Sequence, residues 1–285
     1  MSDNIRLVIE PIDDGIKNFI RLGRNKYSKA DVPIENHIHK GSIEICYLYK
    51  GEQIFQYNNE EKYSLTGGDV FISYPDELHS SGYQPLQKSV LYWLILDISD
   101  KNNFLGYNPS ESQELVTALL EMEKRYFRGS IKLKKILDEV IKLYLEKNKF
   151  YKIRVRNLMV EFLIKIIELE KLNYSNQYSN DIEQCINYIQ NNVEKNLLLN
   201  DLAKIINLSL SRFKQKFKSE VGIPPNEYIQ RCKIEKSKEI LVGEKILTIT
   251  EVALELNFCS SQYFCDTFKK YTNQTPSQYR KINCT

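Results

Sequence analysis

The chain has 285 residues, 42% of them hydrophobic, which is enough for one large domain or two domains of ordinary size. Its 40 basic and 37 acidic residues give a formal net charge of +3, so net charge alone does not indicate binding to nucleic acid or to a membrane surface. No apolar run approaches the roughly 20 residues that cross a bilayer. The 6 cysteines contain no C-x-x-C pair, which argues against a zinc finger and a disulfide framework. We expect two domains, core thiols, a cytoplasmic location and no membrane partner.

Residues 5–98 carry short runs rich in Tyr, Ile and Val that are separated by Gly, Asn and Pro. The runs read SIEICYLY, GEQIFQYN, EKYSL, GDVFISYP and SVLYWLILDI. Closely spaced runs of this kind are typical of the strands and hairpins of a sandwich or barrel. We therefore predict a β-barrel domain over residues 1–109.

The pattern after Pro109 is helical. Ser110 can cap a first helix, a second covers 131–143, and a third covers 155–167 with apolar residues at helical spacing. Two interpretations of residues 110–172 stay open: the helices pack on the barrel, or they form the interface of a homodimer. We assign this segment as a helical dimerisation region. The polar segment LNYSNQYSN then predicts a linker over 173–181.

Residues 182–285 form the predicted second domain, and it contains an internal repeat. Asp201-Leu202-Ala203 parallels Glu251-Val252-Ala253, fifty positions later, and Phe213 and Phe217 parallel Phe264 and Phe268 at an offset of fifty-one. Each copy reads as a helix, a short turn and a second helix, with a small residue in the first helix that allows close crossing. Asn207 and Asn257 stand where the first helix ends, because Asn tolerates the left-handed conformation.

The two phenylalanines in RFKQKFK define the buried face of the second helix of the first copy. At about 100° per residue, Gln215 lies nearest the opposite pole. Its neighbours on that side are Ser211, Arg212, Lys214 and Lys218. Arg or Lys can donate to guanine, Gln can pair with adenine, and lysines can neutralise phosphates, so this helix suits the major groove of double-stranded DNA.

The same wheel applied to the second copy puts Asp266 at the outward pole. Gln262 and Lys269 lie beside it, and Ser261 is at the helix start. Aspartate repels phosphates and can only accept a hydrogen bond, for example from cytosine. We therefore expect this helix to contribute less affinity than the first.

Residues 182–282 resemble the DNA-binding domain of AraC-type (AraC/XylS) transcription regulators. The residues that carry the resemblance are DLA…LSLSRFKQKFKSEVGIPPNEYI and ITEVALELNFCSSQYFCDTFKKYTNQTPSQYR. The resemblance implies that residues 234–241 belong to a long helix joining the two copies. It also implies that both recognition helices enter successive segments of the major groove. The chain departs from the usual pattern at Asn257, where glycine is common, and at Gln215 and Asp266, where arginine is frequent.

All three histidines lie in the β-rich half: His37 and His39 in HIHKGSIE, and His79 in YPDELH. Alternation on a strand would put His37 and His39 on one face. With Glu44 and His79 they would supply three nitrogens and one carboxylate, a set that suits a divalent transition metal. The spacing resembles the two cupin motifs over residues 30–98, although Glu77 stands where glycine is frequent, and it implies a small jelly roll.

Three roles for His37, His39, Glu44 and His79 stay open: a small-molecule effector pocket, a metal site, and a structural pattern. The overall prediction is an α+β multidomain protein with an N-terminal cupin-like barrel and a C-terminal all-α double helix-turn-helix. It would be a sequence-specific transcription regulator and not an enzyme, with no required cofactor. Its expected partners are DNA, a sugar-like effector, a second copy and RNA polymerase. The alternative is a metal-dependent cupin enzyme or a carbohydrate-binding protein with a helical appendage.

Overall fold

The computed structural model describes residues 4–11, 15–172, 178–243 and 247–283. The chain divides into an N-terminal unit, Met1–Ser28 with Pro33–Ser175, and a C-terminal unit, Lys29–Val32 with Asn176–Thr285. Part of the predicted linker, residues 173–177, lies outside the described residues. Helix α4 (Asn180–Asn191) begins inside the predicted linker, because Asp181 in its first turn pairs with Lys216 of another helix.

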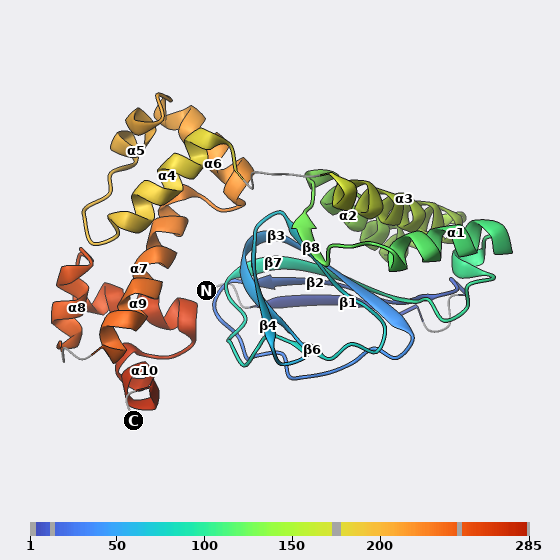
Figure 1. Ribbon diagram of the computed structural model, residues 1–285, viewed down its shortest axis with the longest axis horizontal. Helices are drawn as coiled ribbons and strands as arrows, with labels where there is room; N and C mark the ends of the chain where they lie inside the picture. The colour runs from blue at the N-terminus through green and yellow to red at the C-terminus, as the bar shows by residue number, and fades with distance from the viewer. Residues whose placement is uncertain (1–3, 12–14, 173–177, 244–246, 284–285) are drawn as a thin grey trace. The chain divides into compact units, whose positions relative to one another are not determined.

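The N-terminal unit contains an 8-stranded antiparallel sheet in the order β1-β2-β7-β3-β5-β8, with β4 and β6 also paired to β3. The prediction of a β-rich N-terminal half is confirmed (Figure 1). The strands are β1 (Ile5–Ile9), β2 (Phe19–Tyr27), β3 (Ser42–Tyr57), β4 (Glu61–Thr66), β5 (Asp69–Ser73), β6 (His79–Ser80), β7 (Ser89–Asp97) and β8 (Tyr126–Arg128).

Two runs that the sequence suggests as separate strands form one long strand, β3. Its first part pairs with β5 and its second part pairs with β4, so β3 belongs to both sides of the barrel. Gly51 joins the two parts at φ +95°, and a Cβ there would lie 2.4 Å from the carbonyl oxygen of Lys88. A glycine is needed because both the backbone angle and the close approach exclude a side chain.

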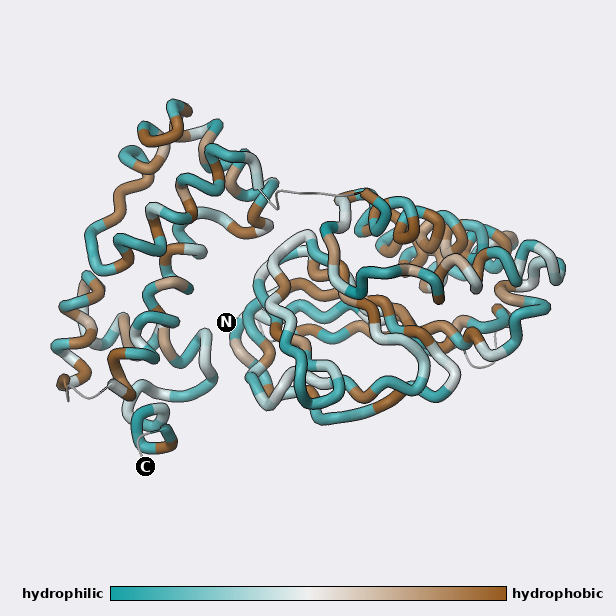
Figure 2. Tube along the Cα trace, in the orientation of Figure 1, coloured by the Kyte–Doolittle hydropathy of each residue, from teal (hydrophilic) through white to brown (hydrophobic). Residues whose placement is uncertain are grey.

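Helices α1 (Pro109–Leu120), α2 (Ile131–Glu146) and α3 (Tyr151–Lys171) lie on one side of the sheet, after the short 3-10 helix η1 (Phe104–Gly106) (Figure 1). Alternation along β3 sends Ile43, Ile45 and Tyr47 into the cluster shared with these helices. Cys46 and Leu48 point the other way, into a second cluster inside the barrel with Phe55, Leu65, Phe71, Leu91, Trp93 and Ile95. The hydrophobic residues, brown in Figure 2, follow these strands and helices. Packing of the helices on the barrel is confirmed, and a dimer interface stays a prediction.

Two local predictions in residues 110–172 are wrong. Asn108, not Ser110, caps α1: its side chain accepts from the amide of Glu111 at 3.0 Å, and Pro109 occupies the first helical turn. The segment is also not wholly helical, since β8 pairs with β5. A three-residue strand is too short for its periodicity to be recognised.

The C-terminal unit is helical in the described part of residues 178–283, and its segment Lys29–Val32 forms no helix. They are α4, α5 (Leu199–Ile205), α6 (Leu210–Val221), α7 (Pro225–Val242), α8 (Ile249–Glu255), α9 (Ser261–Thr272) and α10 (Pro276–Asn283). Each repeat has its own apolar cluster, and α7 supplies Tyr228 and Ile229 to the first and Ile234 and Leu241 to the second. The long joining helix is confirmed: residues 234–241 belong to α7, which Pro225 starts.

The turn between the two helices of each copy has the predicted backbone. Asn207 and Asn257 adopt φ +52° and +50°. The second helix of each copy also ends in the left-handed region, at Gly222 and Asn273. The repeat is therefore present in the backbone angles as well as in the amino-acid sequence.

Cys46 and Cys185 are buried, as expected of core thiols, but Cys259 is exposed in the turn between α8 and α9. The prediction of a core thiol is wrong for Cys259, and Cys284 lies outside the described residues. Within the described ranges, no helix combines the length and the apolar character that a membrane span needs.

Candidate functional sites

Helix α6 presents the polar face that the sequence predicts. Phe213 and Phe217 are fully buried, with ring centroids 5.6 Å apart. The candidate DNA-contacting side chains are all exposed: Ser211, Arg212, Lys214, Gln215 and Lys218. The hydroxyl of Ser209 accepts from the amide of Arg212 and caps the helix. A short capped helix with cations and an amide on its free side can enter the major groove.

Lys216 differs from the other cations of α6, although it continues their alternation in the sequence. Its Nζ lies 2.5 Å from Asp181 Oδ2 of α4 and 4.0 Å from Glu220 Oε1. These carboxylates hold the side chain on the flank that packs toward α4. Lys216 therefore ties α6 to α4 and is not part of the exposed face.

Helix α9 presents a weaker version of this face. Gln262, Asp266 and Lys269 are exposed and Ser261 is partly exposed, while Phe264 and Phe268 are buried. The Gln262 side-chain amide donates to Asp266 Oδ1 at 3.1 Å, which occupies part of its hydrogen-bonding capacity.

Tyr263 was not predicted as a site residue, yet 46% of it is exposed on α9. Its ring packs beside Phe258 with centroids 6.1 Å apart. From the sequence alone, an aromatic residue next to a buried phenylalanine is expected to belong to the hydrophobic core. The helical wheel gives a signal, since at about 100° per residue Tyr263 lies about 60° from Asp266 but about 140° from Phe268.

The structure gives a reason for Asn257 where the resembled family commonly has glycine. The side-chain amide of Asn257 donates to the carbonyl oxygen of Glu194, which precedes α5 in the first repeat. Its own carbonyl accepts from Lys233 Nζ of α7 at 3.1 Å, and burial lowers the pKa of Lys233. Asn257 therefore helps to fix the second repeat against the first repeat and the joining helix.

The other candidate site is the histidine cluster: His37, His39, Glu44 and His79. One ligand atom from each residue lies within 4.8 Å of the others. The ring centroid of His37 is 5.0 Å from that of His39 and 4.2 Å from that of His79. The sequence is right that these side chains meet, but His37 and His39 are not on a regular strand. His37 instead forms an isolated bridge with His79.

Backbone carbonyls orient two of the imidazoles. His37 Nδ1 lies 2.9 Å from the carbonyl oxygen of Glu35, and His79 Nδ1 lies 3.0 Å from that of Glu77. A carbonyl only accepts, so each Nδ1 carries a proton and each Nε2 is left to bond another group. His79 Nε2 lies 2.9 Å from Glu44 Oε2, and His39 Nε2 lies 3.5 Å from the same oxygen.

Burial and neighbouring charges shift the pKa values of Glu44 and His79 in opposite directions. Burial raises the pKa of Glu44, but the adjacent imidazoles of His39 and His79 prevail and bring it to about 2. Burial lowers the pKa of His79, but the Glu44 carboxylate more than compensates and leaves it raised. Burial lowers the pKa of His37. Glu44 is thus an anion above about pH 2, and its carboxylate favours the protonated form of His79.

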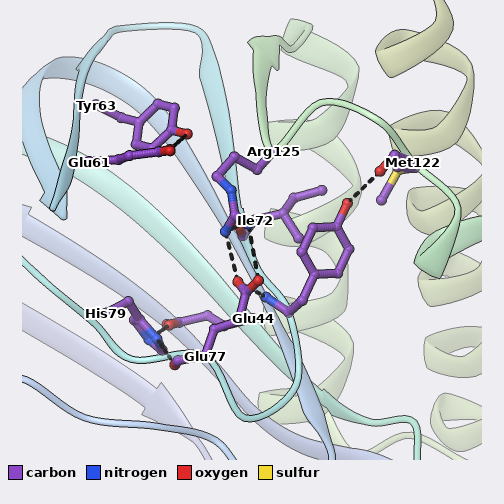
Figure 3. A network of polar contacts seen from close by, with 9 residues as sticks. Glu44, Glu61, Tyr63, Ile72, Glu77, His79, Met122 and Arg125 are labelled. Carbon is purple, nitrogen blue, oxygen red and sulfur yellow. Dashed lines mark hydrogen bonds and ion pairs between the residues drawn. The ribbon is translucent and has the colours of Figure 1, made fainter. Parts of the chain in front are cut away.

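A clamp behind the cluster was missed by sequence reasoning. Arg125 makes a bidentate ion pair with Glu77, with distances of 2.7 Å and 3.0 Å (Figure 3). Its guanidinium also lies 3.9 Å from the ring centre of Tyr57. Glu77 also accepts from the amide of Tyr74 at 2.9 Å. Arg125 is distant in sequence and lies in a segment expected to be helical, so no local pattern signals its role.

The cluster fits two kinds of ligand chemically. Three imidazoles and a carboxylate at these distances fit a divalent transition metal, and the two carbonyl-oriented rings have the outer-shell support of metal-ligating histidines. The same groups can instead bond a polar organic molecule, with Glu44 accepting from hydroxyls. Neither use requires a covalent step.

Comparisons with known proteins agree with this two-part architecture. Residues 27–163 match the AraC-like ligand binding domain, and residues 202–282 match a helix-turn-helix domain. An uncharacterized HTH-type transcriptional regulator of Staphylococcus aureus (strain COL) is 25% identical over 84% of this chain and 31% of its own length. The xylose operon regulatory protein of Escherichia coli (strain K12) is 29% identical over 42% of this chain and 30% of its own length. The chain thus spans about a third of the length of these curated relatives. Among solved structures, ToxT of Vibrio cholerae is 15% identical, with a TM-score of 0.37 over 94% of this chain and 98% of its own.

Proposed function

The chain belongs to the AraC-type transcription regulators, and from this premise we propose that it binds specific double-stranded DNA and changes transcription in response to a small molecule. The exposed polar face of α6, opposite a fully buried phenylalanine pair, carries the proposal. Arg212, Lys214 and Gln215 would read base edges or phosphates, and Lys218 would contact the backbone. Helix α9 would add a second, weaker contact through Gln262 and Lys269.

The test compares two variants of α6 in titrations of operator DNA. The double substitution of Lys214→Ala and Gln215→Ala removes exposed groups, whereas Lys216→Ala removes a lysine of the same helix that pairs with Asp181. We expect the double variant to lose affinity and sequence preference, and to lower the slope of log affinity against log salt by about 0.9 for each lost phosphate contact. Lys216→Ala should keep that slope. An unchanged sequence preference in the double variant would contradict the assignment of the face.

For the N-terminal unit we propose an effector at the histidine cluster, and a carbohydrate is the first candidate. Glu44 and the imidazoles form a polar cluster in a barrel whose strands also carry the apolar cluster around Phe71 and Trp93. Sugar hydroxyls can donate to the carboxylate and accept from ring N–H groups. One relative is by its name the regulator of a xylose operon. Calorimetric titration with simple sugars, repeated with His79→Ala, tests this assignment.

A divalent transition metal is the second candidate, favoured by the carbonyl contacts that occupy the Nδ1 atoms of His37 and His79 and leave their Nε2 atoms as ligands. His37, His39, Glu44 and His79 would hold the ion, which would act as the signal or as a bridge to an oxygen-rich effector. Metal analysis of protein purified without chelator tests this. Less than about a tenth of an equivalent, well below the full occupancy of a four-ligand site, would reject the metal.

We also propose a homodimer through α2 and α3, with RNA polymerase as a further partner. Leu145, Phe150 and Ile153 are large apolar residues exposed on or between these helices, with 63%, 58% and 50% of their surface accessible. Sedimentation analysis of Leu145→Glu tests the dimer. A cupin enzyme or carbohydrate-binding protein with a helical appendage is the rival proposal, and it predicts absent or salt-insensitive DNA binding.

A further inference from the structure

A continuous set of polar contacts runs from the histidine cluster to the end of α3. His79 bonds the carbonyl oxygen of Glu77, and the carboxylate of Glu77 is held by Arg125. The residue before Arg125 continues the path. The amide of Lys124 donates to Glu170 Oε1 at 3.1 Å, and Lys124 Nζ donates to the carbonyl oxygen of Glu170 at 3.2 Å.

Arg125 is the junction of this path, and Figure 3 shows its guanidinium against the carboxylate of Glu77. Besides Glu77, its guanidinium touches the rings of Tyr57 and Tyr74, with 3.9 Å and 5.5 Å to their centres. Its backbone carbonyl accepts from the amide of Ile72 in β5 at 2.8 Å. The ion pair is mostly shielded, with 17% and 16% of the two side chains exposed, so its geometry is held more firmly than that of a surface pair.

Glu170 is the other end of this set of polar contacts. Only 5% of it is exposed, and it lies in the last turn of α3, which ends at Lys171 just before the predicted linker. The last turn of a helix has free carbonyl groups and depends on outside partners. The Lys124 contacts supply such partners, so the position of the 124–125 segment affects how firmly α3 ends.

We propose that Arg125 is a positioning residue that couples the histidine cluster to the last turn of α3. A change at Glu44 or His79 moves the Glu77 loop, Arg125 follows its carboxylate, and the Lys124–Glu170 contacts tighten or loosen. The functional meaning of this coupling rests on the proposed function, because α3 is followed in the sequence by the DNA-binding unit. The coupling itself concerns only the N-terminal unit.

The experiment measures amide hydrogen exchange over residues 163–172 of the full chain, with α2 as an internal reference. Glu44→Gln perturbs the cluster at nearly constant volume. It is introduced alone, with Arg125→Met, and with Arg128→Met. Arg128 is the matched control because it is a nearby arginine, in β8, that pairs with buried Asp69 at 2.9 Å instead of with Glu77.

We expect Glu44→Gln to accelerate exchange in the last turn of α3 at least about threefold in the otherwise unchanged chain and in the Arg128→Met background. In the Arg125→Met background it should add nothing, because the path is cut. An equal acceleration with Arg125→Met, or no acceleration in the otherwise unchanged chain, would overturn the coupling. A residue that merely stabilised the fold would shift the baseline without removing the response to Glu44→Gln.

Two provisions keep the result decisive. If Arg125→Met lowers protection in α2 as well, Arg125→Lys replaces it, since it keeps the charge and loses the bidentate geometry. Exchange is measured without DNA, so a missing acceleration counts against the coupling only. Failure of the unsubstituted protein to bind DNA counts against the proposed function only.

Discussion

Glu44→Gln should destabilise the N-terminal unit by a charge effect that can be worked from the structure. Glu44 is 9% exposed, and its pKa of about 2 compares with an ordinary 4.5. That difference corresponds to on the order of 3 kcal/mol of stability at pH 6. Burial alone would lower the pKa of His79, and the Glu44 carboxylate raises it; this is the same interaction, so the two effects do not add.

The sign of each shift defines the pH window. A depressed carboxyl pKa contributes stability above pH 4.5, and that contribution falls to about 1 kcal/mol near pH 3. A raised histidine pKa contributes below its ordinary value of 6.5, and that contribution is lost as the pH rises through the folded value. The cost of Glu44→Gln should therefore be largest near pH 6 and shrink toward pH 3.

Trp93 makes the measurement selective, because it is the single tryptophan of the chain and lies 7% exposed in the barrel cluster. Urea unfolding followed by its fluorescence reports the N-terminal unit. Glu60→Gln, an exposed carboxylate of the same unit, should change stability by no more than about 0.5 kcal/mol. An equal loss at pH 3 and pH 6 in Glu44→Gln would refute the charge argument and indicate altered packing.

Three further predictions concern the C-terminal unit. Phe217→Ala empties a fully buried position and should lower the free energy of unfolding by about 3–5 kcal/mol. The melting temperature measured by circular dichroism should fall, and DNA binding should be lost. An unchanged melting temperature would contradict the buried face. Gly222→Ala places a side chain at φ +81° and should lower the free energy of unfolding by about 1 kcal/mol in the same assay. An unchanged stability would argue against the left-handed cap. Asp266→Asn removes an exposed negative charge from α9 and should tighten binding to nonspecific DNA in low salt, measured by fluorescence anisotropy. Unchanged binding would contradict the assignment of Asp266 to a face near the phosphates.

Local spacing was enough to predict several features. The pairs Phe213 and Phe217 indicated a helix with one buried face, and Asn207 indicated its left-handed turn, because each depends on backbone geometry within a few residues. The grouping of the three histidines with Glu44 was also predicted, although the assumed strand was wrong. Ser110 was misjudged as a cap because Asn108 has the same chemistry two positions earlier.

The sequence by itself determined the repeat, the buried aromatic pairs and the kinds of ligand atoms in the barrel, since periodicity and residue type record these directly. Only the tertiary structure decided that Lys216 forms an ion pair with Asp181, and that Arg125 forms an ion pair with Glu77 behind the histidine cluster. These partners are separated by 35 and 48 positions along the chain. Local patterns carry no signal for ion pairs at such separations, because folding alone brings the two charges together.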